Sequence, residues 1–398
     1  MLDKEYDVII VGAGPAGLAS AKSCAENNLK TLLVEEHPAI GTPVQCGEAL
    51  ARFVFEKLGM EPEGNEIKKI EVFSPNRKKA EIIFPEPSLF LVIERKRFEK
   101  QLAMKIANIG ANILTKTSAV DVIKENGFIK GAILERFGEK IRIKSKIVID
   151  ASGPNAVIAR KSGLKIYTES GRFDSCAQFQ MSNIKIEKST AEMYFGSFAP
   201  GGYVWIFPKG DGAANVGIGI NGGEGNKALG HLRNFIEKDE RLKNGSIIEM
   251  NAGIVPVGGV IKKMVSNGLI VAGDAARMVN PLTGGGMRFA FRAGEIAGKI
   301  ASDALKAGDF SEKKLSEYEK LWDKEFGLVF KISSVAKDVL FESAEKEVDS
   351  LFEDIGVITV PEPGDKDIML KGLRMVLPVI LKRPRIMFKF GKILKSNM

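Results

Sequence analysis

The feature that most constrains the fold is an apolar strand that runs directly into a glycine-rich turn near the start of the chain. The segment reads Asp7-Val-Ile-Ile-Val-Gly12-Ala-Gly14-Pro-Ala-Gly17. Gly12 allows a sharp turn out of the strand, Gly14 lets a pyrophosphate approach the backbone, and Gly17 lets the following helix pack closely on the sheet. The N–H groups at the start of that helix then hold the phosphate charge. The segment therefore predicts a dinucleotide-binding unit.

The carboxylate that follows narrows the choice of dinucleotide. We expect a helix over residues 15–27 and a second buried strand over 31–34, which ends on Glu35. Glu35 lies 18 residues after Gly17, where a carboxylate accepts hydrogen bonds from an adenosine ribose. A carboxylate suits a free ribose 2′-hydroxyl and repels a 2′-phosphate. The ligand is therefore FAD or NAD rather than NADP.

Composition bounds the class of protein. The 398 residues suffice for two interwoven domains, and 44% hydrophobic with 27% charged residues is an ordinary globular balance. The cysteines, Cys24, Cys46 and Cys176, lie far apart and form no CxxC pair, zinc set or iron–sulfur run, so we expect no metal site. The first strand begins too early for a signal peptide, and no apolar run approaches the ~20 residues of a membrane span. We expect a cytoplasmic protein.

The net charge of +8 is concentrated in the last part of the chain. Residues 371–398 contain eight Lys or Arg and no Asp or Glu, with apolar residues between the charges. Two interpretations fit this tail equally: a solvated basic helix, or a dock for anionic lipid headgroups on the inner face of the cell membrane. We expect no nucleic-acid partner, because the basic residues are not part of any known nucleic-acid-binding motif.

A second glycine-rich strand end occurs late in the chain. A buried strand ends on Gly273-Asp274, and Gly284-Gly-Gly286-Met287 then starts a helix that runs to about Ala304. An aspartate at such a strand end can bind a ribityl hydroxyl, and the helix start offers N–H groups and a positive dipole to an anion. Reduced flavin carries negative charge near N1 and O2. This segment therefore favours a flavin.

The middle of the chain has a different composition, rich in strands and glycines. We expect one antiparallel sheet with strands over residues 173–181, 192–195, 202–207, 213–220 and 247–255, interrupted by a helix over 226–238. A period of two puts Tyr203, Trp205 and Phe207 on one face of a strand. Three such rings are most often core, and they equally suit the wall of an apolar pocket.

Two further residues are open to two interpretations each. Arg95, at a strand-to-helix joint, is placed like a diphosphate or ribityl contact, and a solvated arginine fits as well. Cys46 is followed by Gly47 in a turn-rich loop soon after the dinucleotide strand. It could lie near the reactive end of a flavin, although the pattern alone favours a small buried thiol.

Several motifs together resemble a known family. The first glycine turn with its acid, and the late Gly273-Asp-Ala-Ala276 with the glycines that follow, resemble FAD enzymes of the glutathione-reductase superfamily, in the p-hydroxybenzoate-hydroxylase-like branch. Tyr203-x-Trp205-x-Phe207-Pro208, eight residues and then Gly217-Ile-Gly219 resembles the YxWxFPx(7–8)GxG pattern of geranylgeranyl reductases. The archaeal branch is similar along nearly the whole chain, and it saturates the isoprenoid chains of membrane glycerophospholipids.

The resemblance implies an α/β fold with a glutathione-reductase-type, Rossmann-like FAD domain, an inserted antiparallel-sheet substrate domain and a helical C-terminal region. We expect the FAD domain over residues 1–165 and 257–310, with a small antiparallel excursion over 119–143. The substrate domain is expected over 166–256. The basic, helical C-terminal region is expected over 311–398.

The resemblance also implies the site. It implies that FAD is contacted by Ala16, Glu35, Arg95, Ala119 and Asp274, in addition to the glycines Gly12, Gly14 and Gly17. It places Cys46, Gly47 and Ala49 along the flavin ring or its ribityl arm, and Gly286 and Met287 at the pyrimidine edge of the ring. It makes Tyr203, Trp205 and Phe207 the lining of a prenyl tunnel.

These residues suggest a reaction. Reduced FAD would give a hydride to one carbon of a trisubstituted alkene, and a proton would reach the other carbon. By the resemblance, Cys46 is the nearest titratable candidate for the acid, or a residue that only shapes the pocket, whereas His37 and His231 are poorly placed. The hydroxylase-type Ala-Asp-Gly is here Ala151-Ser152-Gly153, which argues against direct use of NAD(P)H and for an external donor, ferredoxin-like or another reductant.

Two other functions remain open on the same scaffold. One is an FAD-dependent monooxygenase or halogenase of an apolar substrate, although Tyr203 and Phe207 depart from the halogenase WxWxIP strand. The other is a non-redox carrier of prenyl lipids. A prenylated glycerophospholipid or another geranylgeranyl compound is the expected substrate of the reductase.

Overall fold

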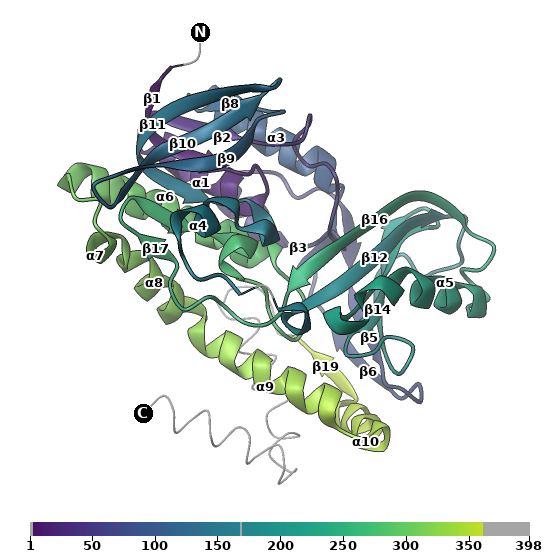
Figure 1. Cartoon of the computed structure of the whole chain (residues 1–398). Helices are drawn as coiled ribbons and strands as arrows, with labels where there is room; N and C mark the ends of the chain where they lie inside the picture. Colours follow the sequence, from purple (N-terminus) through teal and green to yellow (C-terminus); the bar gives the residue numbers. More distant parts are fainter. Residues whose placement is uncertain (1–2, 168, 361–398) are drawn as a thin grey trace. The chain divides into compact units, whose positions relative to one another are not determined.

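The computed structural model describes residues 3–167 and 169–360, and the chain forms two compact units (Figure 1). Unit 1 comprises Met1–Val44, Arg95–Glu169 and Pro256–Leu328. Unit 2 comprises Gln45–Glu94, Ser170–Val255 and Val329–Met398. Each unit is assembled from three separate stretches of chain.

Unit 1 is built on a sheet whose central strands are parallel. Its strands are β1 (Glu5–Val11), β2 (Thr31–Val34), β8 (Asn112–Leu114), β9 (Ser118–Glu125), β10 (Phe128–Arg136), β11 (Glu139–Asp150), β17 (Val265–Ser266) and β18 (Leu269–Val271). The order is β17-β18-β11-β1-β2-β8. Val8, Ile9 and Ile10 of β1 are fully buried, because β1 lies between β11 and β2 and its sheet is covered on both faces.

The helices of unit 1 are α1 (Pro15–Glu26), α3 (Arg95–Asn108), α4 (Val157–Ser162), α6 (Met287–Ala307), α7 (Glu312–Leu315) and α8 (Glu317–Trp322). Helices α1 and α6 lie in close contact because α6 has glycines at the crossing. A Cβ on Gly294 would lie 2.2 Å from the carbonyl oxygen of Ala16, and one on Gly298 would lie 2.5 Å from Cβ of Ser23. The first and the late glycine-rich segments are therefore held together by helix packing.

The small antiparallel excursion differs from the prediction in one respect. The predicted excursion ends at residue 143, but the strand that contains this residue, β11, continues to Asp150. Its first half pairs antiparallel with β10, and its second half pairs parallel with β1. The alternation of buried and exposed residues continues through Lys144 and Lys146, so nothing in the chain ends the strand there.

Unit 2 contains a mixed sheet. Its strands are β5 (Lys69–Phe73), β6 (Lys79–Ile83), β12 (Phe173–Ser182), β13 (Thr190–Phe195), β14 (Tyr203–Gly210), β15 (Ala213–Asn221), β16 (Ser246–Pro256) and β19 (Val357–Thr359), in the order β16-β12-β15-β14-β13-β5-β6-β19. A smaller sheet contains β3 (Ala49–Ala51), β7 (Phe90–Val92) and β4 (Asn65–Ile67). All five predicted strands are present, but the sheet is not wholly antiparallel, because β13 pairs parallel with β5 and β6 pairs parallel with β19.

The predicted boundaries of the FAD domain also differ from the units. Residues 45–94, placed by sequence in the FAD domain, belong to unit 2, and residues 311–328 belong to unit 1. The parallel pairing of β5 with β13 accounts for the first difference. Contact between Phe289 of α6 and Trp322 of α8, with ring centroids 6.4 Å apart, accounts for the second.

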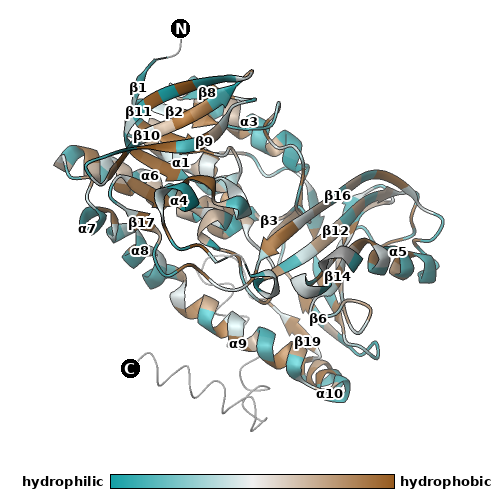
Figure 2. Cartoon of the chain, viewed as in Figure 1, coloured by the Kyte–Doolittle hydropathy of each residue, from teal (hydrophilic) through white to brown (hydrophobic). Residues whose placement is uncertain are grey.

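The large sheet of unit 2 has two different faces. One face packs on α5 (Ala228–Lys238) through buried residues that include Val204, Ile218 and Leu232. We call the opposite face, which carries Tyr203, Trp205 and Phe207, the aromatic face. At its β13 side it packs on α9 (Leu328–Glu342) and α10 (Glu345–Ile355). Helix α9 alternates hydrophobic and hydrophilic residues, as an amphipathic helix does (Figure 2).

The C-terminal region is helical as far as it is described, through α9 and α10, and then forms the short strand β19. The basic tail over 371–398 lies outside the described residues. Among the helices that the structure describes, none combines the length and the apolar character that crossing a bilayer requires.

Candidate functional site

The first glycine turn in unit 1 has the geometry of a phosphate cradle. Gly12 has a φ of 95°, and a Cβ there would lie 2.4 Å from the carbonyl oxygen of Ala151. A Cβ on Gly17 would lie 1.8 Å from the carbonyl oxygen of Gly12. At Gly14, by contrast, the nearest atom to such a Cβ is Nη2 of Arg95, at 3.8 Å. Gly12 and Gly17 are therefore needed for packing, and Gly14 leaves its backbone open to a ligand.

Glu35 is held directly beside this turn, at the end of β2. Its Oε2 accepts a hydrogen bond from the N–H of Ala13 at 2.8 Å, and its Oε1 accepts one from the N–H of His37 at 3.0 Å. The side chain keeps 12% of its surface exposed. A carboxylate has acceptor capacity for ~four hydrogen bonds, so the same group suits a ribose diol. Glu35 thus fits the predicted role.

Arg95 and Asp274 bring opposite charges to the same turn. Arg95 opens α3, donates from Nε to Oε1 of the buried Glu99 at 2.6 Å, and places its Nη2 beside Gly14. Burial raises the pKa of the Asp274 carboxyl, and the positive charges of Arg95 and Arg277 partly offset this effect. The structure therefore unites Gly14, Arg95 and Asp274, which lie far apart in sequence.

The late glycine segment completes this part of the site. A Cβ on Gly273 would lie 2.8 Å from Cβ of Ala16, and one on Gly286 would lie 3.4 Å from Oδ1 of Asp274. Met287, buried at 8% exposure, begins α6. The positive end of a 21-residue helix thus lies beside Asp274. Ala119, also 8% exposed, lies on β9 of the same unit.

A buried arginine and a buried aspartate hold the adjoining loops of unit 1. Arg277 is 1% exposed, and its Nη1 donates to the carbonyl of Pro154 at 2.7 Å and to that of Asp274 at 3.0 Å. Asp150 accepts from both the N–H and the hydroxyl of Ser152. The Ser152 hydroxyl also accepts from the N–H of Val157 at 2.8 Å. Ser152, which replaces the hydroxylase-type aspartate, therefore serves the fold.

The aromatic strand of unit 2 is explained by two glycines on its neighbour. The ring centroids of Tyr203 and Trp205 lie 5.9 Å apart, and those of Trp205 and Phe207 lie 6.3 Å apart, so the three side chains form one row. On β15, Gly219 pairs with Tyr203 and Gly217 pairs with Trp205. A Cβ on Gly217 would lie 2.2 Å from Cζ2 of the indole. Gly217, the first glycine of the GxG half of the motif, therefore makes room for the Trp205 ring.

The loop that contains Cys46 lies on this row. Nε1 of Trp205 donates to Oε1 of Gln178 at 2.9 Å, and Nε2 of Gln178 donates to the carbonyl of Cys46 at 3.0 Å. A Cβ on Gly47 would lie 3.0 Å from the Phe207 ring. Trp205 is 8% exposed, as a core residue would be, whereas Tyr203 and Phe207 are half-buried. Ala49 begins β3 and is exposed.

Three titratable groups lie around Tyr203 on the same face. Burial raises the pKa of the Tyr203 hydroxyl, and negative charge on Cys176, Asp174 or Cys46 raises it further. Burial raises the pKa of Asp174 to about 6, although Nζ of Lys337 on α9 lies 3.6 Å away. Burial also raises the pKa of the Cys176 thiol to about 12, which keeps that thiol protonated. Asp174 therefore titrates nearest neutrality.

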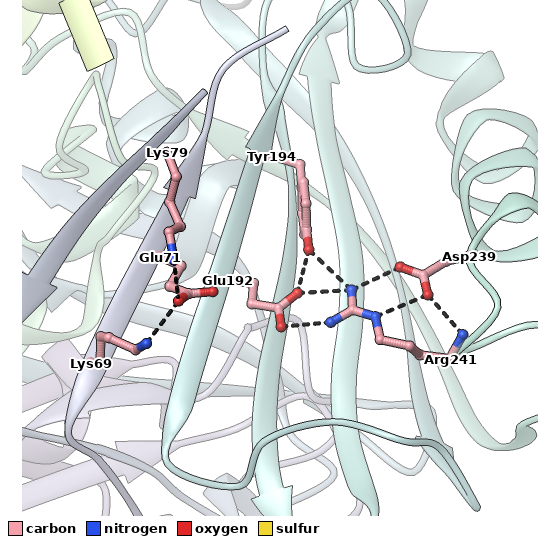
Figure 3. A network of polar contacts seen from close by, with 7 residues as sticks. All are labelled: Lys69, Glu71, Lys79, Glu192, Tyr194, Asp239 and Arg241. Atoms are coloured by element: carbon pink, nitrogen blue, oxygen red, sulfur yellow. Dashed lines mark hydrogen bonds and ion pairs between the residues drawn. The ribbon is translucent and has the colours of Figure 1, made fainter. Parts of the chain in front are cut away.

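Figure 3 shows a network of polar groups on the face of the same sheet that lies opposite the aromatic face. There Arg241 donates to both carboxylate oxygens of Glu192, at 2.8 and 3.0 Å, and pairs with Asp239 at 2.8 Å. A pocket of about 420 Å³ is lined by Asp239 and Arg241 together with Arg77 and Asn234. Glu192 alternates with Met193, which pairs with Trp205, so this network is on the face opposite the aromatic row. Its charges pair with one another and hold the sheet to the turn after α5.

Sequence reasoning missed several polar residues on the aromatic face. They are Glu48, Asp174, Gln178, Lys209 and Asn215. The period of two was a signal that could have found some of them, because Asp174 and Gln178 flank Cys176 at alternate positions of one strand, and Lys209 continues the aromatic row. Glu48 gave no such signal, because it lies in a loop.

Comparison with known proteins identifies related families. Three family models match this chain: FAD-dependent oxidoreductase over residues 7–200, geranylgeranyl reductase catalytic domain over 172–255, and squalene epoxidase over 234–388. Among solved structures, a geranylgeranyl bacteriochlorophyll reductase-like protein from Thermoplasma acidophilum superposes with a TM-score of 0.91 at 32% identity, covering 98% of this chain and 99% of that one. A flavin-dependent brominase superposes with a TM-score of 0.76 at 18% identity, covering 99% of each chain, and shows the fold alone.

Curated relatives match over the full length. A digeranylgeranylglycerophospholipid reductase from Methanocaldococcus jannaschii is 40% identical and covers 99% of each chain. One from Methanosphaera stadtmanae is 36% identical over 98% of this chain and 99% of its own, and one from Methanosarcina acetivorans is 39% identical over 88% of each. The predicted α/β fold and the FAD cofactor are confirmed. The chain therefore belongs to the geranylgeranyl reductase family of FAD-dependent oxidoreductases.

Proposed function

We propose that this protein saturates C=C bonds in the geranylgeranyl chains of a digeranylgeranylglycerophospholipid. The single observation that carries the proposal is the full-length match to reductases of that name, 40% identical over 99% of both chains. The proposal agrees with the aromatic row of unit 2, in which Trp205 occupies the space left by Gly217 on the neighbouring strand. A geranylgeranyl chain is a long apolar ligand, and such ligands bind against aromatic and aliphatic side chains.

The residues proposed to hold the cofactor lie in unit 1. Gly14 leaves its backbone open to the pyrophosphate, Arg95 adds a positive charge there, and Glu35 accepts from the adenosine ribose. Asp274 would bind a ribityl hydroxyl, and the start of α6 at Gly286 and Met287 would face negative charge on the reduced ring. Ala16, Ala119, Cys46, Gly47 and Ala49 remain proposed contacts by family resemblance alone.

The chemistry has two parts. Reduced FAD, when bound, supplies the hydride that reaches one carbon of the double bond. The protein has to hold that double bond, keep water out and deliver a proton to the other carbon. We assign the proton to the thiol of Cys46, and the lining of the lipid chain to Tyr203, Trp205 and Phe207. The electrons come from an external donor, ferredoxin-like or another reductant, and because the substrate is a lipid, the protein meets it at the surface of the cell membrane.

An anaerobic spectroscopic experiment tests this function. We expect the purified protein to be yellow, dithionite to bleach it, and a digeranylgeranyl lipid to restore the colour, whereas a saturated lipid of the same headgroup should not. A colourless protein that binds the lipid would identify a prenyl-lipid carrier. Recolouring by oxygen, with no response to the unsaturated lipid, would point to a monooxygenase or halogenase.

A further inference from the structure

The loop that contains Cys46 is held by an unusual residue. Glu48 has a φ of 67°, in the left-handed region that non-glycine residues seldom adopt, and it is only 3% exposed. A glutamate is rarely buried unless it is paired. Both features cost free energy, so the surrounding structure must hold this residue in place.

The carboxylate of Glu48 is anchored by two residues of the large sheet. Nζ of Lys209 forms an ion pair with Oε2 of Glu48 and pairs with Oε1 of Glu94 at 2.7 Å; the Lys209 side chain is 5% exposed. Nδ2 of Asn215, fully buried, donates to the same Oε2 at 2.7 Å and to the carbonyl of Gly47 at 3.2 Å. Within the described part of the chain, Oδ1 of Asn215 has no hydrogen-bond partner. The hydrogen bonds that the Asn215 side chain makes there therefore go to this loop.

The backbone of the loop is fixed at two further points. Nε2 of Gln178 donates to the carbonyl of Cys46 at 3.0 Å, and the N–H of Ile93 donates to the carbonyl of Glu48 at 3.0 Å. The peptide groups on both sides of Gly47 are thus tied to β12, to β15 and to the end of β7. With its neighbours fixed, the N–H of Glu48 points at one atom, Sγ of Cys46, at 3.2 Å.

An N–H aimed at sulfur has a definite chemical effect. A hydrogen bond to the charged form of a group favours that form, so the Glu48 amide favours the Cys46 thiolate. The carboxylate of Glu48 would oppose this through its negative charge, and Lys209 neutralises that charge. Tyr203 on β14 interacts electrostatically with this thiol, and the same hydroxyl also interacts with Cys176 and Asp174 on β12.

We propose that Glu48, anchored by Lys209 and Asn215, is a positioning residue that holds its own amide against Sγ of Cys46 so that this thiol can release a proton to the substrate. The inference rests on the proposed function. In the proton step the S–H bond breaks and a C–H bond forms at one alkene carbon, while the other carbon receives the hydride from the reduced flavin. The thiolate keeps the N–H hydrogen bond and regains a proton from solvent.

The acidity of Cys46 can be measured without lipid or turnover. The full-length, FAD-loaded protein is alkylated with iodoacetamide across a pH series, and peptide mass spectrometry gives a rate for each cysteine. The midpoint of the rate with pH reports the thiol pKa, and the plateau at high pH reports accessibility. The fully buried Cys24, whose pKa burial raises to about 12, is the internal control for unfolding.

Three variants decide the proposal. Glu48→Gln keeps an oxygen that accepts from Asn215, and we expect its midpoint to stay near that of the unmodified protein. Glu48→Ala removes the anchor, and Asn215→Ala loosens the loop without changing any charge. We expect the midpoint to rise by about one unit in Glu48→Ala relative to the charge-matched Glu48→Gln, and in Asn215→Ala relative to the unmodified protein, so that alkylation below the midpoint slows ~tenfold, because a hydrogen bond to a charged acceptor contributes on the order of 1.5 kcal/mol.

The contrary results are equally definite. Unchanged midpoints in both Glu48→Ala and Asn215→Ala would overturn the proposal, as would a rise in plateau alone. If Glu48→Ala fails to fold, Asn215→Ala decides the question, because it retains the Glu48 side chain and both charges. If the protein saturates the lipid but the alkylation midpoint of Cys46 is the same in all variants, the proposed function stands and only the positioning role of Glu48 is rejected.

Discussion

A Cβ added to Gly217 would lie 2.2 Å from Cζ2 of Trp205, a distance that no pair of unbonded carbon atoms tolerates. The indole therefore occupies the space that a side chain on the neighbouring strand would fill. This relationship makes the YxWxFP strand and the later GxG one structural feature, because the second provides the room that the first needs.

The first prediction is that Gly217→Ala displaces Trp205. Over-packing of this kind costs about 1–3 kcal/mol of unfolding free energy, and the shifted ring loses its hydrogen bond to Gln178. Thermal unfolding and lipid reduction measure the two effects. Gly230→Ala, in α5, is the matched control, because nothing lies within 4 Å of its added Cβ, and alanine there should stabilise the helix. Equal stability of both variants would contradict the packing argument.

The second prediction concerns the cofactor. Arg95→Met removes the charge beside Gly14 and should weaken FAD binding ~10–100-fold, which is the loss of about 1.5–3 kcal/mol expected for one charge-assisted hydrogen bond. Fluorescence titration of the apoprotein with FAD measures it. Lys100→Met, on the exposed side of the same helix, should leave the affinity unchanged. An Arg95→Met variant that binds FAD as tightly as its control would remove Arg95 from the site.

The third prediction follows from the burial of Asp174. Its pKa is raised from 3.8 to about 6, so between these values the folded state binds more protons than the unfolded state. The stability contributed by this group is therefore full below pH ~4 and falls as the pH rises through ~6. Asp174→Asn should exceed the unmodified protein in stability at neutral pH by about 1–3 kcal/mol, and the difference should shrink toward pH ~4.

Chemical denaturation at several pH values checks this expectation. A difference between Asp174→Asn and the unmodified protein that stays constant with pH would contradict the role given to burial.

The fourth prediction separates catalysis by Cys46 from cofactor binding. Cys46→Ala should abolish lipid saturation while the protein stays yellow, because the thiol is proposed to supply the proton and most of the residues proposed to hold the cofactor lie in unit 1. Cys24→Ala, on α1, is the control and should retain turnover. Near-normal turnover by Cys46→Ala would remove the thiol from the acid role.

The parts of the structure that local pattern determines could be predicted from the sequence. The strand at Thr31–Val34 and the strand-turn-helix at Gly12 were predicted to within a residue or two, because a short buried strand and a glycine turn need particular residues. The late segment at Asp274 was expected to return to the same sheet, and the pairing of β18 with β11 confirms it.

What could not be predicted depends on contacts between distant residues. The parallel pairing of β5 with β13, which moves residues 45–94 into unit 2, leaves no periodic trace in either strand. The burial of Glu48 could not be predicted either, because its partners Lys209 and Asn215 are more than 160 positions away and lie on two different strands. A buried charge is identified by its partners, and only the fold supplies them.

The most direct test of the central claim is the mass of the lipid after anaerobic turnover with the dithionite-reduced protein. We expect the digeranylgeranyl lipid to gain the mass of two hydrogen atoms for each double bond removed, in proportion to the flavin that is reoxidised, and Gly217→Ala to slow this gain. A lipid recovered with its mass unchanged while the flavin stays reduced would contradict the account.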